Sequence, residues 1–434
     1  MSRSIYERSS VEEGDESVAI RSRRGSHARS PGLRSFKREL NVLRLIHSTC
    51  NISRIELSRE TGLSAASITA IVQNLIDKGL VSETGHNSSA LGRKPVSLSL
   101  RDDAGFVVGV DLGSFYTRVV VTDVRGTLVC KEESKTGMPD GRDLVISRTL
   151  KTIHRAIHDS GKPRSAFRGI GMGHSGVIDA SKGLVLSFPR PGQMAEWKNV
   201  PVRDILEREF GVPCLLEDSV RAIATAEKHF GLGAGLTDFI YVDVGMGIGA
   251  AIFLDGKLYR GSGGSAGEFG HMTVDEHGPL CCCGNNGCLE TLASCGAIIQ
   301  SVRRAIEKGV DSKVREWAQG DLNRISIEMI GQAARQNDSL SFRVLHDAVS
   351  HIAVALADVV NLLNPHVLVF GGALFRSAPE LFLEPLQRTI KQRALEKSAN
   401  EVQLKISTLG SEAGALGAGR LISEIVVERL YQEA

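Results

Sequence analysis

The chain repeats one pattern of strands and glycine turns at two places that lie far apart in the sequence. The first copy, FVVGVDLGSFYTRVVVTDVRGTLVCKE, covers residues 106–132, and the second, FIYVDVGMGIGAAIFLDGKLYRG, covers residues 239–261. Each copy holds an apolar strand that ends in Asp-x-Gly, a second apolar strand and a further turn that contains glycine. An internal duplication of this kind predicts two similar α/β lobes that face each other across a cleft.

Length and charge indicate a multidomain protein with a basic front segment. The 434 residues are too many for one ordinary core and suggest two to three domains. Residues 1–100 hold 15 Lys and Arg against 10 Asp and Glu, although the whole chain carries only +2. This imbalance indicates an anionic partner for the front segment alone. No apolar run reaches the roughly 18 residues of a membrane span, and the start lacks the layout of a secretory signal. We therefore expect a cytoplasmic protein with no membrane partner.

The chain divides into three parts by composition and periodicity. Residues 1–33 are rich in Ser, Arg and Gly without apolar periodicity, which predicts a disordered tail. Residues 34–102 form a first domain of short helices and strands. Residues 103–434 contain both copies of the repeat and form the two-lobed body.

The first domain has the pattern of a winged helix-turn-helix. Apolar residues repeat at helical spacing over residues 36–46, Ser53 and Glu56 have the spacing of a capping box, and Gly62 ends a second helix. A third helix begins after Ser64, which is placed to cap it. The segment after Gly79 is typical of two strands joined by a polar loop, which would form the wing.

The free face of the third helix is small and polar, so that it can approach base edges closely. Arg93 and Lys94 stand at the tip of the wing, where a cation reaches phosphate or a minor groove. A winged-helix module that binds another protein is the alternative, because the basic charge is modest. The residues that we predict to contact DNA are Ser64, Ala66, Ser67, Ala70, Gln73, Asn74, Arg93 and Lys94.

Four of the eight cysteines fall in one short stretch, GHMTVDEHGPLCCCGNNGCLE, at residues 270–290. Three thiolates and one imidazole complete a tetrahedral Zn²⁺ site, and a site with four protein ligands is structural rather than catalytic. Both His271 and His277 are candidates for the imidazole. Cys282 is the extra thiol, whose side chain should point away, although a swap with a neighbour stays open. The remaining cysteines are scattered, which favours a reducing compartment over a disulfide framework.

These features together resemble the ROK family (repressors, open reading frames and kinases) over about residues 36–425. The family pattern C-x-C-G-x-x-G-C-x-E, preceded by Glu-x-Gly-His, is matched by Glu268, Gly270, His271, Cys281, Cys283, Gly284, Gly287, Cys288 and Glu290. The resemblance implies an α/β protein in which an N-terminal winged helix-turn-helix precedes a two-lobed actin-like, sugar-kinase fold of the ribonuclease H type. It also implies one structural Zn²⁺ per chain, held by His271, Cys281, Cys283 and Cys288. The sugar ligands that it implies are Glu268, His271 and Glu290.

The catalytic base of the family stands in an Asn-Asp pair after a strand, and this chain has Glu217-Asp218 there, in VPCLLEDSVRAIATAE. Asp218 can take a proton from a sugar hydroxyl during phosphoryl transfer, or simply bind that hydroxyl. Glu217 in place of Asn leaves the sugar preference open, and we count both residues as sugar-site candidates. An acidic pair at a helix start also satisfies the helix N-terminus, which is an alternative role.

The loops that would hold a nucleotide are degenerate. Kinases of the family carry Asp-x-Gly-Gly-Thr-Lys in the first hairpin, whereas DLGSFYTR places two aromatic rings where they would crowd a phosphate. In DVGMGIGA, Met246 stands where the kinases have Thr. The glycine pair of NPHVLVFGGAL matches the adenosine side, and it equally suits a strand-to-helix turn. We interpret as vestigial nucleotide loops Asp111, Gly113, Gly245, Gly247, Gly249, Gly371 and Gly372.

The sequence therefore favours a sugar-responsive DNA-binding regulator, a repressor of carbohydrate-metabolism genes, over an enzyme. Two-fold symmetric operator DNA would require a homodimer or homotetramer. The first alternative is an ATP-dependent sugar kinase with an appended DNA-binding head, in which Asp218 is catalytic. The second is a regulator that binds no sugar, in which zinc and fold serve assembly alone.

Overall fold

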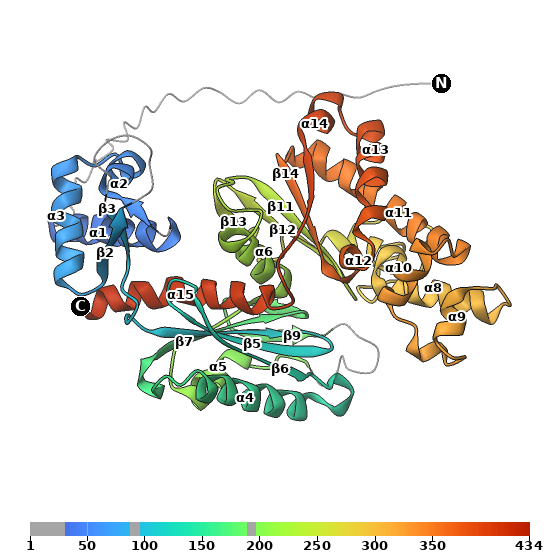
Figure 1. Ribbon diagram of the computed structural model, residues 1–434, viewed down its shortest axis with the longest axis horizontal. Helices are drawn as coiled ribbons and strands as arrows, with labels where there is room; N and C mark the ends of the chain where they lie inside the picture. The colour runs from blue at the N-terminus through green and yellow to red at the C-terminus, as the bar shows by residue number, and fades with distance from the viewer. Residues whose placement is uncertain (1–30, 50, 87–95, 189–196) are drawn as a thin grey trace, which may run out of the picture.

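The computed structural model describes residues 31–49, 51–86, 96–188 and 197–434. It contains an N-terminal head and two α/β lobes, and a long C-terminal helix, α15 (Ala413–Glu433), runs from between the lobes to the head (Figure 1). We call the lobe built around residues 106–218 lobe I and the lobe built around residues 239–406 lobe II.

The head is a winged helix-turn-helix, as the sequence predicts. Ser53 begins the second helix with a complete capping box, because Glu56 N donates to its hydroxyl and its own N–H donates to Glu56. Gly62 ends that helix in the left-handed conformation. The strands pair antiparallel in the order β1-β3-β2. The elements are α1 (Pro31–Thr49), β1 (Ile52–Ser53), α2 (Arg54–Thr61), α3 (Ala65–Asp77), β2 (Val81–His86) and β3 (Val96–Leu100).

The first helix begins earlier than the composition suggests. We expected a disordered tail over residues 1–33, but α1 already begins at Pro31, which suits the first helical position because proline has no N–H to leave unpaired. Residues 1–30 lie outside the described residues, and so do residues 87–95 of the predicted wing tip, with Arg93 and Lys94.

Lobe I holds the first copy of the repeat in a five-stranded sheet of order β10-β7-β4-β5-β6. The copy supplies three antiparallel strands, and two parallel strands extend the sheet beside β4. The elements are β4 (Phe106–Leu112), β5 (Tyr116–Asp123), β6 (Leu128–Lys135), α4 (Arg142–Asp159), β7 (Phe167–His174), β8 (Val177–Asp179), β9 (Leu184–Ser187), α5 (Val202–Phe210), β10 (Cys214–Asp218) and α6 (Ser219–Phe230).

Lobe II repeats this topology, with sheet order β13-β12-β11-β14-β15. Again three antiparallel strands are extended by two parallel ones, which confirms the predicted duplication. The elements are β11 (Phe239–Val244), β12 (Ile248–Leu254), β13 (Lys257–Tyr259), α7 (Leu289–Ala293), α8 (Cys295–Glu307), α9 (Lys313–Trp317), α10 (Ile327–Arg335), α11 (Ser339–Leu363), β14 (Val367–Gly371), α12 (Gly372–Ser377), α13 (Leu383–Arg393), α14 (Glu396–Glu401) and β15 (Gln403–Ile406).

Helix α15 lies directly on the sheet of lobe I and along α6. A Cβ added at Gly109 of β4 would overlap the carbonyl oxygen of Ala415, and one added at Gly417 would overlap that of Ala222 in α6. Glycine at these two positions therefore allows backbones to approach more closely than any side chain would permit. The consequence is a helix that is seated tightly against both a strand and a second helix.

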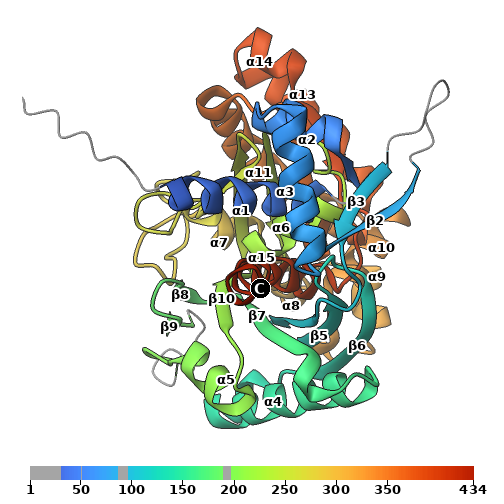
Figure 2. The same ribbon diagram turned by 90° about the vertical axis from the view of Figure 1, so that its left-hand side faces the viewer.

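The far end of α15 is built into the head. Ile422, Val426, Val427 and Tyr431 belong to one apolar core together with the buried residues of α1 and α3. The Arg420 guanidinium donates to the ring of His47 in α1, and His47 Nε2 lies 2.9 Å from the Val124 carbonyl of lobe I. Figure 2 shows α1 and α3 around the C-terminal end of this helix. The head and lobe I thus share one core.

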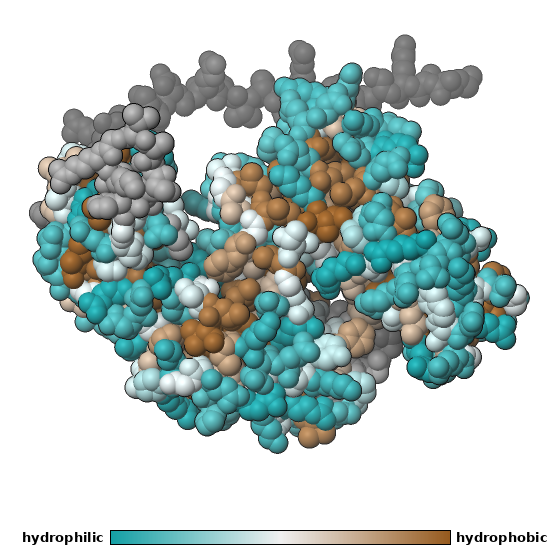
Figure 3. All heavy atoms as spheres, in the orientation of Figure 1, coloured by the Kyte–Doolittle hydropathy of each residue, from teal (hydrophilic) through white to brown (hydrophobic). Residues whose placement is uncertain are grey.

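Among the described residues, one helix, α11, is long and apolar enough to cross a membrane by length and composition. Its most apolar window is half buried, and its side chains pack into the core of lobe II, which explains its composition without a bilayer. On the face drawn in Figure 3, the outer sides of the head and of both lobes are largely hydrophilic, and hydrophobic residues gather between the two lobes.

Candidate functional site

A cluster of one histidine and three cysteines forms at the edge of lobe II. The ligand atoms of His271, Cys281, Cys283 and Cys288 all lie within 4.8 Å of one another. Cys281 Sγ is 3.6 Å from His271 Nδ1, and Cys283 Sγ is 3.6 Å from Cys288 Sγ. A tetrahedral ion with bonds of about 2.0–2.3 Å separates its ligands by about 3.5–3.8 Å, so this donor set fits a metal ion.

The loop around the cluster explains how His271 and Cys288, 17 positions apart in sequence, meet. Short bridges pair Thr273 with Cys288 and Leu280 with Asn286, and Cys281 N donates to Asn285 O at 2.7 Å. Among the described residues, the group of side chains that could hold a metal ion contains His271 and does not contain His277. Cys282 is exposed and stands outside the group, as expected for the extra thiol.

His271 faces the cluster with one ring nitrogen and Glu268 with the other. Its Nδ1 points to Cys281, while its Nε2 lies 3.9 Å from Glu268 Oε2. A metal held through Nδ1 would fix the ring and leave Nε2 for a second partner. Both His271 and Glu268 remain accessible, with 31% and 61% of their side chains exposed.

Glu290 ties the cysteine motif to the second glycine loop. It lies in the first turn of α7, and its Oε2 accepts a 2.9 Å hydrogen bond from Ile248 N, at the start of β12. A Cβ at Gly247 would come within 2.9 Å of the same oxygen. Gly247, which we predicted to belong to a nucleotide loop, therefore leaves space for Glu290, which we predicted to bind sugar.

Asp218 ends β10 and caps α6. Its Oδ1 accepts hydrogen bonds from Val220 N at 2.9 Å and Arg221 N at 3.1 Å, so the helix-capping alternative is realised. Burial raises the pKa of Asp218 to about 6, and the charges of Glu217 and Glu268 add to this rise.

Glu217 is occupied by protein partners, which differs from our expectation of an open sugar ligand. Its Oε1 accepts from Arg221 Nη1 at 3.1 Å and from Asp218 N at 3.0 Å. Its Oε2 accepts from Arg260 Nε at 3.0 Å and Nη2 at 2.8 Å. Only 2% of the Glu217 side chain is exposed. Sequence reasoning missed Arg260, although this cation directly follows the last strand of the second repeat.

The loops that we interpret as vestigial nucleotide loops lie in both lobes. Burial raises the pKa of Asp111 in lobe I to about 6, Arg118 opposes this rise and the charge of Asp243 in lobe II adds to it. Phe115 and Tyr116 are exposed at the turn between β4 and β5, and Arg118 stacks over the Tyr116 ring.

The glycines of these loops have packing reasons of their own. A Cβ at Gly371 would overlap the hydroxyl of Tyr241, and Gly372 has a φ of 90° and lies against the backbone of Val244. The strand-to-helix turn thus requires both residues whether or not a nucleotide binds. Gly113, Gly245 and Gly249 lie at the ends of the paired strands of the two repeats.

The recognition helix α3 presents most of the residues that we predicted. Ser64, Ala66, Ser67, Ala70 and Gln73 are exposed, and Ser64 also caps the helix by accepting from Ser67 N. Thr69 shares this exposed face and could have been predicted from its helical spacing between Ala66 and Gln73.

Asn74 does not belong to the open face. Its Nδ2 donates a 2.7 Å hydrogen bond to Glu39 Oε2 in α1, and the residue is half-buried. In this conformation α1 packs against that side of α3, and the contact of Asn74 with DNA stays a prediction.

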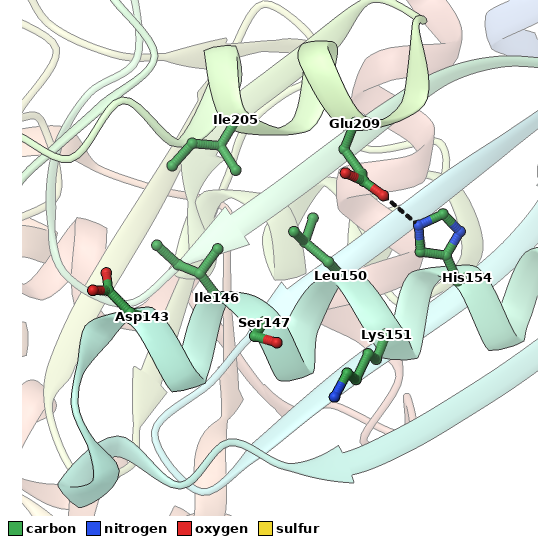
Figure 4. Close-up of a pocket in the computed structure, with 8 residues that line it drawn as sticks. All are labelled: Asp143, Ile146, Ser147, Leu150, Lys151, His154, Ile205 and Glu209. Carbon is green, nitrogen blue, oxygen red and sulfur yellow. Dashed lines mark hydrogen bonds and ion pairs between the residues drawn. The ribbon is translucent and has the colours of Figure 1, made fainter.

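A groove on the outer face of lobe I holds none of the predicted residues. It is an open hollow of about 470 Å³ between α4 and α5, and the His154 ring bonds Glu209 across it at 2.7 Å (Figure 4). The candidate site is therefore the group of residues between the lobes and not this groove.

The comparisons with known proteins agree with this arrangement. A model of the ROK family matches residues 107–425, which is most of the chain. The chain belongs to the ROK family. The head of this ROK protein matches the model of a winged helix-turn-helix DNA-binding domain over residues 36–82.

Two curated relatives extend over most of the ROK chain. It is 31% identical over 380 residues to the xylose repressor of Caldicellulosiruptor bescii, a match that covers 87% of this chain and 93% of the relative. It is 29% identical over 387 residues to the DNA-binding transcriptional dual regulator NagC of Escherichia coli, with 89% and 92% covered.

A solved ROK family transcriptional regulator, a homologue of the E. coli MLC protein, has a TM-score of 0.75 and 28% identity. That match covers 92% of this chain and 98% of the solved one. The ROK chain is therefore similar over its head as well as its lobes to proteins named as regulators. This supports a DNA-binding regulator rather than an enzyme.

Proposed function

We propose that this ROK protein is a repressor of carbohydrate-metabolism genes that binds double-stranded operator DNA and responds to a sugar or sugar derivative. The name of the xylose repressor supports a sugar as the effector. One observation carries the proposal: α15 packs against the candidate sugar-site helix α6 and also enters the core of the head. A single element thus touches both the site that would sense and the domain that would bind DNA.

The sugar would lie between Asp218 of lobe I and Glu268, His271 and Glu290 of lobe II. Carboxylates and a neutral imidazole nitrogen accept hydrogen bonds from hydroxyl groups, and a fixed set of acceptors discriminates between epimers. Asp218 has one oxygen engaged in capping α6, and Glu290 has one engaged by Ile248 N, so both carboxylates are oriented before a ligand arrives.

The proposed metal is Zn²⁺, with a structural role. His271, Cys281, Cys283 and Cys288 would hold it, and four protein ligands would leave no open position for catalysis. Bound zinc supplies cross-linking of the loop and fixes the His271 ring, which would keep Nε2 directed toward Glu268.

The response to sugar would pass through α6 and α15. A ligand shifts a conformational equilibrium only by binding one lobe arrangement more tightly than another. Movement of Asp218 would move α6, whose Ala222 backbone lies against Gly417 of α15. The head would follow, because the end of α15 contributes Ile422, Val426 and Tyr431 to its core.

A homodimer or homotetramer in the cytoplasm completes the proposal. Operators with two-fold symmetry place two recognition helices about one helical turn of DNA apart, which requires at least two heads. A DNA-binding repressor acts where the chromosome is, and this supports the cytoplasmic assignment.

Binding of the full chain to the promoter DNA of the genes around its own gene tests the function. We expect a salt-sensitive, sequence-specific complex that one member of a panel of pentoses, hexoses and amino sugars, each free and phosphorylated, weakens. Absence of specific binding with and without every sugar would contradict the proposal.

Two charge variants show whether α3 makes the contact. Ala70→Asp places a negative charge on the exposed face and should weaken DNA binding about tenfold or more, because like charges at an interface are costly. Ser339→Asp makes the same charge change at an exposed position of lobe II and should leave DNA binding unchanged.

A further inference from the structure

Three charged side chains connect the two lobes beside the candidate sugar site. Glu217 is the second-last residue of β10 and Arg221 lies in the first turn of α6, both in lobe I, whereas Arg260 follows β13 in lobe II. Glu217 Oε1 pairs with Arg221 at 3.1 Å, and its Oε2 pairs with Arg260 at 2.8 Å. We call these three residues the inter-lobe bridge.

Arg221 makes a second connection across the lobes. Its Nη2 donates to the carbonyl oxygens of Gly264 and Ala266, the latter at 3.3 Å. The segment 260–267 closes on itself through Ala266 N and Arg260 O, and Gly267 O accepts from Ala250 N of β12. Both arginines therefore hold the loop that leads directly into Glu268.

Burial of these charges gives little net stability, so their use is to fix an orientation. The Glu217 and Arg221 side chains are 2% and 5% exposed, and burying ions costs about as much free energy as their pairing returns. What buried ion pairs do provide is a fixed geometry, because any other arrangement leaves a charge unpaired. A neutral Asn at position 217, the residue of the family pattern, could not balance two guanidinium groups.

We propose that Glu217 is a positioning residue rather than a sugar ligand, and that the inter-lobe bridge holds segment 260–267 so that Glu268 faces Asp218. This inference rests on the proposed function in that the effector would bind between these two carboxylates. Arg221 and Arg260 occupy both oxygens of the Glu217 carboxylate, which would otherwise be able to bind a sugar hydroxyl. The effector is thus selected by Asp218, Glu268, His271 and Glu290, and the bridge positions the loop that carries Glu268.

Arg260→Met tests the bridge, because it removes the lobe II cation and leaves the buried Glu217–Arg221 pair intact. We measure hydrogen exchange of a peptide covering residues 260–267 in the full chain without sugar, and then affinity for the sugar identified by the panel. Exchange should become roughly fivefold faster and the sugar should bind roughly fivefold more weakly, as expected for a half-exposed ion pair. Arg260→Lys should restore part of both.

Arg335→Met is the matched control. Arg335 has 43% of its side chain exposed, against 44% for Arg260, and it pairs with Glu380 in lobe II away from the bridge. It should change neither quantity. Glu217→Gln leaves Arg221 buried without its charge partner and should lower the unfolding temperature as well as sugar affinity.

The outcomes separate this inference from the proposed function. If Arg260→Met leaves the exchange of 260–267 unchanged, the pair of Glu217 with Arg260 does not hold the loop, and the inference that this bridge between the lobes positions Glu268 is wrong. Faster exchange with unchanged sugar affinity would also overturn it, since the loop would then have no part in positioning Glu268. If no sugar binds the unaltered protein, the proposed function fails, while the exchange experiment still decides whether the bridge holds the loop.

Discussion

The hydroxyl of Tyr431, near the end of α15, donates a 2.8 Å hydrogen bond to Glu39 in α1. The same Glu39 oxygen accepts from Asn74 of the recognition helix at 2.7 Å. Lys78 at the end of α3 lies over the Tyr431 ring, 4.3 Å from its centre. Two hydrogen bonds, both to Glu39, therefore connect the recognition helix α3 to α15, the helix that passes the candidate sugar site.

Tyr431→Phe should uncouple sugar binding from DNA release. The variant keeps the ring in the core and loses one hydrogen bond, so the free energy of unfolding should fall by about 1 kcal/mol. Sugar affinity should stay unchanged, and the weakening of DNA binding by sugar should become smaller. DNA titrations with and without the effector measure this. Tyr259→Phe, at an exposed position of β13, is the control and should behave like the unaltered protein.

Cys283→Ser should remove the metal, and Cys282→Ser should not. Cys283 belongs to the four-residue cluster, whereas the adjacent Cys282 is exposed and outside it. Because metal affinity at a structural site contributes to folding, Cys283→Ser should lower the unfolding temperature, and a chelator should lower that of the unaltered protein in the same way. Elemental analysis for zinc gives the readout. One equivalent of zinc in purified Cys283→Ser would contradict the ligand assignment.

Asp111→Asn should stabilise the protein at neutral pH and not at low pH. Burial raises the pKa of Asp111 to about 6 in the folded chain, above the value of about 4 in an unfolded one. The folded state therefore holds its proton more tightly, and the cost of its buried charge appears as pH rises from about 4 to 6. The stability difference between Asp111→Asn and the unaltered protein should grow across this window and stay constant above it. Urea unfolding at pH 4, 5, 6 and 7.5 measures it, and a difference independent of pH would contradict the burial of this charge.

Gly109→Ala should displace α15 from lobe I. The added Cβ would overlap the Ala415 carbonyl, a backbone atom that cannot rotate away, so destabilisation of about 2 kcal/mol or more is expected. Gly85→Ala, where an added Cβ meets nothing within 4 Å, is the control and should cost far less. Thermal unfolding measures both. Equal unfolding temperatures would show that the helix is not seated as tightly as the backbone positions indicate.

The features that sequence reasoning predicted are those that local pattern determines. Ser53 and Glu56 form their capping box within one turn, and the two Asp-x-Gly hairpins repeat the same strand order, so neighbouring residues contain the information. The choice of His271 over His277 came from the family pattern, and the cluster geometry agrees with it.

The features that it missed depend on how distant elements pack. Arg221 stands four residues after Glu217, so one half of the inter-lobe bridge is local in sequence, but Arg260 joins only because two lobes pack on each other. Asn74 looks like a free polar residue on α3, and its partner Glu39 comes within reach only because α1 packs beside α3. No local pattern encodes such contacts.

The apolar end of α15 joins the head and lobe I in one hydrophobic core, so the two should unfold together. Ile422, Val426, Val427 and Tyr431 belong to one apolar core with buried residues of α1 and α3, so removal of the residues before 103 would expose part of this apolar surface to water and promote aggregation. In calorimetry the head and lobe I should melt together as one cooperative unit, with no separate transition for a head of fewer than eighty residues. The head and the body therefore depend on each other for stability. A stable form of this chain without the head would need polar substitutions along the end of α15.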